Sequence, residues 1–171
     1  DGKERRLLEC SRTILNWLRH LPEGEVVLVR EVLEIIISGQ ALDLERFANA
    51  TQENPVALQN DAALEDYAWR VAGCVGAFWT KLGFLTLGDK FSRSPEAELV
   101  EQGIAYGKAL QLVNILRDVE ADLAVGRCYL PVADPGDFSQ LLACHARWLT
   151  QAEQWLGEGE NYAAKLRLRR L

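Results

Sequence analysis

Apolar residues recur every three to four positions along most of the chain, which is the spacing of an amphipathic α-helix. Between Lys3 and His20, for example, Leu7, Ile14 and Leu18 follow this spacing. No stretch alternates between apolar and polar residues over the length of a β-strand, and no internal repeat stands out. The pattern therefore predicts an all-α fold, a bundle of helices over residues 3–20, 27–47, 61–87, 96–124, 138–156 and 162–171.

Glycine, proline and polar clusters separate these helices. Residues 49–60 and 134–137 have the composition of loops, and residues 88–95 that of a connection. Gly126 is placed to end the helix over residues 96–124, because glycine adopts the left-handed conformation that often closes a helix. Gly83 predicts a bend within the helix over residues 61–87.

Composition places the chain among folded proteins. With 171 residues, of which 49% are apolar and 26% charged, it has the size and balance of one globular unit, so we expect a single helical domain over residues 1–171. Charged residues interrupt the longest apolar runs before the roughly 20 residues that a membrane-spanning helix needs. No signal peptide is visible, and we expect the protein in the cytoplasm, with peripheral membrane contact.

The residue balance also argues against two kinds of partner. A net charge of −6 and the lack of a basic stripe interleaved with aromatic residues argue against nucleic acid. Four cysteines and two histidines lack the spacing of zinc ligands, and we expect each cysteine to be a small buried apolar residue. The basic C-terminal residues fit a solvated helix end better than a site for anionic lipid: Lys165, Arg167, Arg169 and Arg170.

One predicted helix carries polar residues where a core helix is normally apolar. At about 100° per residue, Gln111, Asn114, Asp118 and Asp122 fall within an arc of about 80° and form one stripe. The positions around the stripe are apolar, which predicts that the helix is enclosed and that the stripe faces a cavity. Arg117 is expected to point elsewhere. The apolar positions are Leu110, Leu112, Val113, Leu116 and Val119.

The two carboxylates of this stripe predict a metal site. On a low-dielectric wall, carboxylates one helical turn apart repel each other unless a cation lies between them. Mg²⁺ prefers oxygen ligands and is commonly held by one or two carboxylates plus substrate phosphates. We therefore expect Asp118 and Asp122 to bind Mg²⁺, with Gln111 and Asn114 beside them. The spacing alone leaves a solvated acidic face open as the alternative.

Two motifs resemble the signatures of the squalene/phytoene synthase family. The segment LQLVNILRDVEADLAVGRCYLP, residues 110–131, is similar to that family's second aspartate-rich motif, and YAWRVAGCVG, residues 67–76, to its other hallmark. A looser likeness extends over the rest of the chain. The resemblance implies the isoprenoid synthase fold, a helical bundle around a central cavity, of which this chain would form the C-terminal part.

The resemblance also implies a reaction. Family members join two identical prenyl diphosphates, farnesyl or geranylgeranyl, head to head through a cyclopropyl diphosphate to squalene, dehydrosqualene or phytoene. They use Mg²⁺, and those that make squalene also use NADPH. Matched by position, Asp118 and Asp122 would bind the Mg²⁺ that bridges to the diphosphate, and Gln111 and Asn114 would line that site, with Asn114 close enough to reach the metal.

Four further residues receive a role from the resemblance. Tyr67 would face the cavity as a hydrogen-bond donor or proton shuttle; the alternative is a tyrosine that anchors the core. Val71 and Val75 would form an apolar wall for a prenyl chain, although the same spacing is typical of plain core. Arg127, after Gly126, would close over the diphosphate or simply cap the helix end. Small residues would let a neighbouring helix approach closely: Ala72, Gly73, Gly76 and Ala77.

The chain departs from the family pattern in an important respect. The family uses two facing aspartate-rich motifs, and only one is present here, since Asp61 with Glu65 lies outside the motif context. Ala121 also stands where many relatives carry an acidic residue. We expect the other motif upstream of Asp1 and expect residues 1–171 to be inactive alone. Two alternatives stay open: a head-to-tail prenyl transferase or terpene cyclase of the same fold, and a non-catalytic relative.

Overall fold

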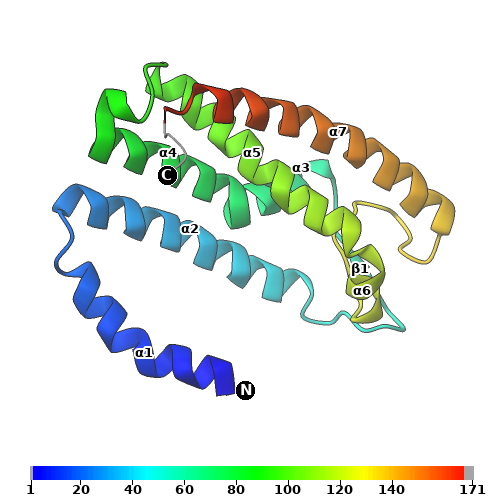
Figure 1. Cartoon of the computed structure of the whole chain (residues 1–171). Helices are drawn as coiled ribbons and strands as arrows, with labels where there is room; N and C mark the ends of the chain where they lie inside the picture. The colour runs from blue at the N-terminus through cyan, green and yellow to red at the C-terminus, as the bar shows by residue number, and fades with distance from the viewer. Residues whose placement is uncertain (1, 168–171) are drawn as a thin grey trace.

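The structure, a computed structural model, describes residues 2–167, and helices make up most of it (Figure 1). The predicted all-α class is confirmed. The longer helices are α1 (Gly2–Leu18), α2 (Glu23–Arg46), α4 (Cys74–Leu87), α5 (Glu96–Arg117) and α7 (Phe138–Lys165). The shorter elements are α3 (Asp61–Ala68), the π-helical turn η1 (Trp69–Gly73), the 3-10 turn η2 (Gly88–Lys90), α6 (Val119–Ala124) and the two-residue strands β1 (Val56–Ala57) and β2 (Arg127–Cys128).

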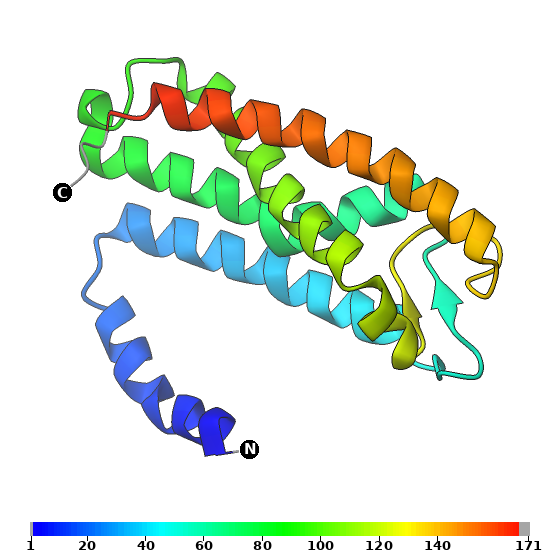
Figure 2. The same ribbon diagram turned by 45° about the vertical axis from the view of Figure 1, so that its right-hand side comes forward.

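Helix α5 is the centre of the bundle. It packs between α7 and α4, and α2 packs against the other side of α4 and η1 (Figures 1 and 2). Leu99, Ala109 and Leu112 of α5 are completely buried, as is Leu64 of α3. Burial of these apolar side chains is the main stabilising contribution to the packing.

Helix α1 stands apart from this bundle in both views (Figures 1 and 2). Its exposed side chains include apolar ones, since Leu8 is 73% and Trp17 is 63% exposed. In the described part of the chain, α1 therefore leaves uncovered an apolar surface of the kind that normally packs against another element.

Glycines allow α4 and η1 to cross α5 at very short range. A Cβ atom on Gly76 would lie 1.9 Å from the carbonyl oxygen of Gly103, and a Cβ atom on Gly107 would lie 2.3 Å from that of Ala72. Because no side chain fits at these distances, the backbones are in direct contact. This confirms the expected close approach of a neighbouring helix at Ala72 and Gly76.

The helix predicted over residues 96–124 is broken, and this part of the prediction is wrong. The backbone of Asp118 has φ −98° and ψ 10°, so α5 ends at Arg117 and α6 begins at Val119. A ring nitrogen of His145 from α7 lies 3.2 Å from the carbonyl oxygen of Leu116, which gives one carbonyl of the last α5 turn a partner outside the helix. Gly126, with φ +82°, closes α6 as expected.

Three further details differ from the predicted elements. The two C-terminal helices are one helix, α7, because Gly157 only weakens a helix and Gly159 gives the room that Tyr106 needs. The irregularity in the run 61–87 is the π-turn η1, and Gly83 instead accommodates the ring of Phe91. The loop over residues 49–60 contains β1, which pairs in parallel with β2.

Surface features also refine the expectations. Cys74, Cys128 and Cys144 are buried as expected, but Cys10 is exposed. The continuous helical run Asp61–Lys90 has a mean hydropathy of 1.3 over 18 residues, so by length and composition it could cross a membrane, contrary to the expectation from the shorter apolar runs. In this fold, the same run packs against α2 and α5. Of the basic C-terminal residues, Lys165 pairs with Glu98, Arg167 donates to the carbonyl of Asp89, and Arg169 and Arg170 lie outside the described residues.

Candidate functional site

The predicted polar stripe lies on the open side of α5 and α6. Gln111, Asp118 and Asp122 are half-buried and Asn114 is exposed, whereas Leu112, Ile115 and Leu116 face the core. The helix is less enclosed than expected, because part of the surface beside the stripe is open to solvent among the described residues. The apolar neighbours of the stripe are correspondingly open: Leu110 is 46% and Val113 is 39% exposed.

Asp118 is held by its neighbour in sequence. Arg117 donates to both carboxylate oxygens, from Nε at 2.7 Å and from Nη2 at 2.6 Å. This ion pair lowers the pKa of Asp118 below its ordinary value. The prediction that Arg117 points away from the stripe is wrong, because the non-helical backbone at Asp118 brings the two adjacent side chains together.

Asp122 has the opposite electrostatic environment. Burial raises its pKa, repulsion from Asp118 raises it further, and Arg127 partly opposes the rise. The two carboxylates are thus shifted in opposite directions, as expected for like charges near each other with only one of them paired. A cation beside Asp122 would offset the cost of its ionised form.

Tyr67, Tyr129 and the carboxylate of Asp43 lie near Asp122. The Tyr129 hydroxyl donates to Oδ2 of Asp43 at 3.0 Å, and the Arg127 guanidinium reaches the same oxygen at 3.5 Å. The rings of Tyr67 and Tyr129 stack with their centroids 4.7 Å apart. Asp122, Arg127 and Tyr129 line a small gap next to Val119. The structure therefore brings Tyr67 and Arg127 to Asp122.

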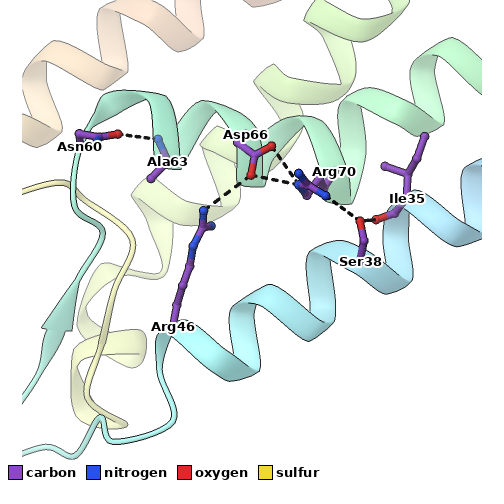
Figure 3. Close-up of polar contacts among 7 residues, drawn as sticks. All are labelled: Ile35, Ser38, Arg46, Asn60, Ala63, Asp66 and Arg70. Carbon is purple, nitrogen blue, oxygen red and sulfur yellow. Dashed lines mark hydrogen bonds and ion pairs between the residues drawn. The ribbon is translucent and has the colours of Figure 1, made fainter.

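An ion-pair network holds the elements that carry Asp43 and Tyr67. Figure 3 shows Arg46 of α2 and Arg70 of η1 both directed at Asp66 of α3. Arg70 donates to both oxygens of Asp66, at 2.9 and 3.0 Å, and also to the Ser38 hydroxyl on α2 at 2.8 Å. These bonds fix α2 against the α3–η1 junction, one residue from Tyr67 in sequence and close to Asp43.

The pairing of β1 with β2 positions Arg127. Val56 is in register with Arg127, and the amide of Val56 donates to the carbonyl of Gly126 at 2.9 Å. The loop that follows α2 is thereby tied to the segment that follows α6. Arg127 consequently lies next to the C-terminal end of α2, within reach of Asp43. Its position in the sequence, just after a helix end, would not by itself predict this contact.

An open apolar cavity is lined by residues of η1, α4, α5 and α7. Val71 and Val75 line it from one side, and Leu110, next to Gln111, lines it from α5. Trp79, also in its wall, is 59% exposed. Apolar side chains make up most of its wall, and the role of Val71 and Val75 in binding a prenyl chain stays a prediction.

Asp43 and Tyr129 were not among the residues predicted from the sequence. A signal for Asp43 exists in the sequence, because the residues four positions before and after it, Gly39 and Phe47, are non-polar; the structure buries both. A carboxylate between two buried positions at helical spacing stands out in the same way as Asp118 and Asp122 do. Tyr129 lies within the motif at residues 110–131 but carries no distinguishing spacing.

The side-chain oxygens of the stripe suit a Mg²⁺ ion that takes its remaining ligands from elsewhere. No group of three or more metal-ligating His, Cys, Asp or Glu side chains gathers among residues 2–167. Two carboxylates and two side-chain amides do suit Mg²⁺ that also takes ligands from substrate phosphates. Both Asp118 oxygens accept from the Arg117 guanidinium, and each keeps a second lone pair that could bind a metal.

Comparison with known proteins identifies the family. The model of the family described as squalene/phytoene synthase matches residues 3–171. The chain belongs to the squalene/phytoene synthase family. A presqualene diphosphate synthase from Rhodopseudomonas palustris is 38% identical over 104 residues, which cover 61% of this chain and 31% of that protein. A 15-cis-phytoene synthase from Synechocystis sp. is 40% identical over 102 residues, which cover 58% of this chain and 28% of that protein.

A solved structure supports the fold of this squalene/phytoene synthase family member. A crystal structure of a dehydrosqualene synthase in complex with ligand matches with a TM-score of 0.60 at 22% identity. The match covers 97% of this chain and 61% of that chain. The chain thus spans about a third or less of the curated relatives' length and about three fifths of the solved structure's chain.

Proposed function

We propose that the chain forms one half of the active site of a Mg²⁺-dependent prenyl transferase that condenses two farnesyl or geranylgeranyl diphosphates head to head. One observation carries the proposal: the carboxylates Asp118 and Asp122, with pKa values shifted in opposite directions, lie together with Tyr67 and Arg127. Val71, four residues after Tyr67, and Leu110, next to Gln111, line an open apolar cavity. Membership of the squalene/phytoene synthase family supports the reaction type.

The residues of the stripe would act on the diphosphate. When bound, Mg²⁺ neutralises the negative charge of the departing diphosphate. Asp118 and Asp122 would hold the metal, and Gln111 and Asn114 would orient its water ligands or donate to phosphate oxygens. Arg127 would form a charge-assisted hydrogen bond to the diphosphate, because its guanidinium is partly exposed on this side.

The tyrosine and the apolar wall would act on the rest of the substrate. The Tyr67 hydroxyl would donate a hydrogen bond near the departing diphosphate, since burial raises its pKa and keeps it protonated. The Tyr67 ring would stabilise positive charge on the allylic carbon. Val71 and Val75 would contact the prenyl chain, for which an apolar surface is favourable.

We further propose that this chain works within a longer polypeptide. Trp79, Leu110 and Val113 expose large apolar side chains beside the stripe, which a second wall would cover. That wall would also bring the facing acidic groups that a fully neutralised diphosphate requires. We place the assembled enzyme in the cytoplasm with peripheral membrane contact, because a C30 or C40 hydrocarbon product partitions into lipid.

Product analysis tests the proposed function. The protein at its full natural length is incubated with Mg²⁺ and either farnesyl or geranylgeranyl diphosphate, with and without NADPH, and the products are identified by mass spectrometry. We expect a C30 or C40 hydrocarbon or its cyclopropyl diphosphate precursor. A longer linear diphosphate would instead indicate head-to-tail elongation, a cyclic C15 or C20 hydrocarbon would indicate a terpene cyclase, and no product from any donor would indicate a non-catalytic relative.

A further inference from the structure

Asp43 has a largely buried carboxylate group, and only one of its two oxygens has a hydrogen-bond partner among the described residues. Its Oδ2 atom accepts from Tyr129 and lies within reach of Arg127, whereas its Oδ1 atom is buried and has no hydrogen-bond partner among the described residues. The side chain is only 13% exposed. A buried acceptor without a partner costs free energy, so fold stability does not account for a carboxylate at this position.

Tyr129 fixes the position of the Asp43 carboxylate. Its ring stacks on Tyr67 at 4.7 Å and meets the ring of Phe47 edge to face at 5.1 Å, and only 8% of the residue is exposed. A ring packed on both sides has a single orientation. Its hydroxyl therefore points in one direction, and the hydrogen bond to Oδ2 sets where that oxygen lies.

Arg127 is the more exposed partner of the Asp43–Arg127 pair. Its side chain is 39% exposed, while its backbone is fixed by the pairing with Val56. The guanidinium lies 5.9 Å from the centre of the Phe47 ring and 3.5 Å from Oδ2 of Asp43, and together with Asp122 and Tyr129 it lines the same gap. An exposed arginine loses side-chain entropy when it binds a ligand, and a carboxylate that holds it in place beforehand reduces this cost.

The geometry points to Asp43 and Tyr129 as positioning residues: we propose that they hold the Arg127 guanidinium beside Asp122, in the orientation in which it binds the diphosphate. Tyr129 orients Asp43, and Asp43 orients Arg127. Neither Asp43 nor Tyr129 touches the substrate in this arrangement. The inference rests on the proposed function, because it assumes that a diphosphate binds at Asp118 and Asp122.

Inorganic pyrophosphate with Mg²⁺ provides a probe that is independent of prenyl transfer. Its dissociation constant is measured by isothermal titration calorimetry for the full-length protein and for the variants Asp43→Asn, Tyr129→Phe and Arg127→Gln. Asp43→Asn keeps the shape of the side chain, and Tyr129→Phe keeps both ring contacts. We expect about 3- to 10-fold weaker binding for these two variants and about 10- to 100-fold weaker binding for Arg127→Gln, which removes a charged hydrogen bond.

A double-mutant cycle separates positioning from a general structural effect. In the Arg127→Gln background, Asp43→Asn should cause no further loss of affinity, because the guanidinium that it positions is absent. With farnesyl diphosphate as substrate, Asp43→Asn and Tyr129→Phe should raise KM by a larger factor than they lower kcat. Asp61→Asn is the matched control, because Asp61 also pairs with an arginine: its Oδ2 atom accepts from Arg147 at 2.5 Å, on the exposed side of α3. This variant should bind pyrophosphate like the wild type.

The possible outcomes are distinguishable. If the wild type binds pyrophosphate and Asp43→Asn and Tyr129→Phe bind it equally well, the positioning role is wrong and the proposed function stands. A loss in Asp43→Asn that persists in the Arg127→Gln background likewise overturns the positioning role. If the wild type itself binds no pyrophosphate in the presence of Mg²⁺, both the proposed function and the positioning role fail.

Discussion

Asp43 shows how a single residue can cost stability while serving a site. Burial raises its pKa above the ordinary carboxyl value, and the hydrogen bond from Tyr129 and the charges of Arg127 and Arg46 offset this only in part. A raised pKa favours the folded state while the carboxyl is protonated, and this contribution is lost as the pH rises from the ordinary value of 3.8 through the raised one. At neutral pH the ionised carboxylate therefore destabilises the fold.

Asp43→Asn should consequently be at least as stable as the wild type at pH 7. The gain should be greatest above the raised pKa of Asp43 and should shrink as the pH falls towards 3.8, because the wild-type carboxyl then becomes neutral. Urea denaturation at several pH values measures this. A variant that unfolds more easily than the wild type at pH 7 would show that the carboxylate stabilises the protein.

The sequence predicts the residues of the stripe but not how each is held. Gln111, Asn114, Asp118 and Asp122 follow from helical spacing, and none of the four is buried in the structure. The Arg117–Asp118 pair depends on a local break in the helix, which the helical pattern does not encode. Asp43 is 75 residues from Asp118 in the chain, and only the packing of α2 on the α3–η1 junction brings it to the site.

At the scale of the elements, the crossing of α4 with α5 depends on glycine. Gly103→Ala would place a Cβ atom 2.7 Å from the Thr80 hydroxyl oxygen and 2.9 Å from the carbonyl oxygen of Gly76. The helices would have to separate, so we expect a loss of about 2 kcal/mol or more in the free energy of unfolding. Gly157→Ala is the control, because it lies in helix α7 with no atom within 4 Å of its Cβ position.

Gly157→Ala should stabilise the protein by about 0.5–1 kcal/mol, since alanine is the better helix former. Urea denaturation of both variants gives the comparison. Equal effects of the two substitutions would contradict the close crossing of α4 and α5.

Helix existence was easier to predict than helix ends. The apolar periodicity identifies the helical stretches because burial of one helix face repeats with the helical period. The prediction of a break at residues 157–161 is wrong because Gly159 serves a contact with Tyr106 rather than a turn. The β1–β2 pairing could not be predicted either, since two residues on each side carry no periodic pattern.

At the scale of the whole molecule, the described residues leave the apolar cavity open to solvent. Trp79 and Leu110 are exposed in its wall, and on the proposed function one aspartate motif would provide only part of the charge that neutralises a diphosphate. Residues 1–171 alone should therefore turn over farnesyl or geranylgeranyl diphosphate at least about 100-fold more slowly than the full-length protein. Comparable turnover by residues 1–171 would show that no second wall is needed.

The titration of Mg²⁺ and inorganic pyrophosphate into Asp118→Asn and Asp122→Asn tests the central claim most directly. Isothermal titration calorimetry on the full-length protein should show pyrophosphate binding that requires Mg²⁺ and that weakens by about 30-fold or more in each variant, because each carboxylate is replaced by a neutral amide. Asp61→Asn should leave this binding unchanged. Pyrophosphate binding that is independent of Mg²⁺, or that survives both substitutions at Asp118 and Asp122, would contradict the account.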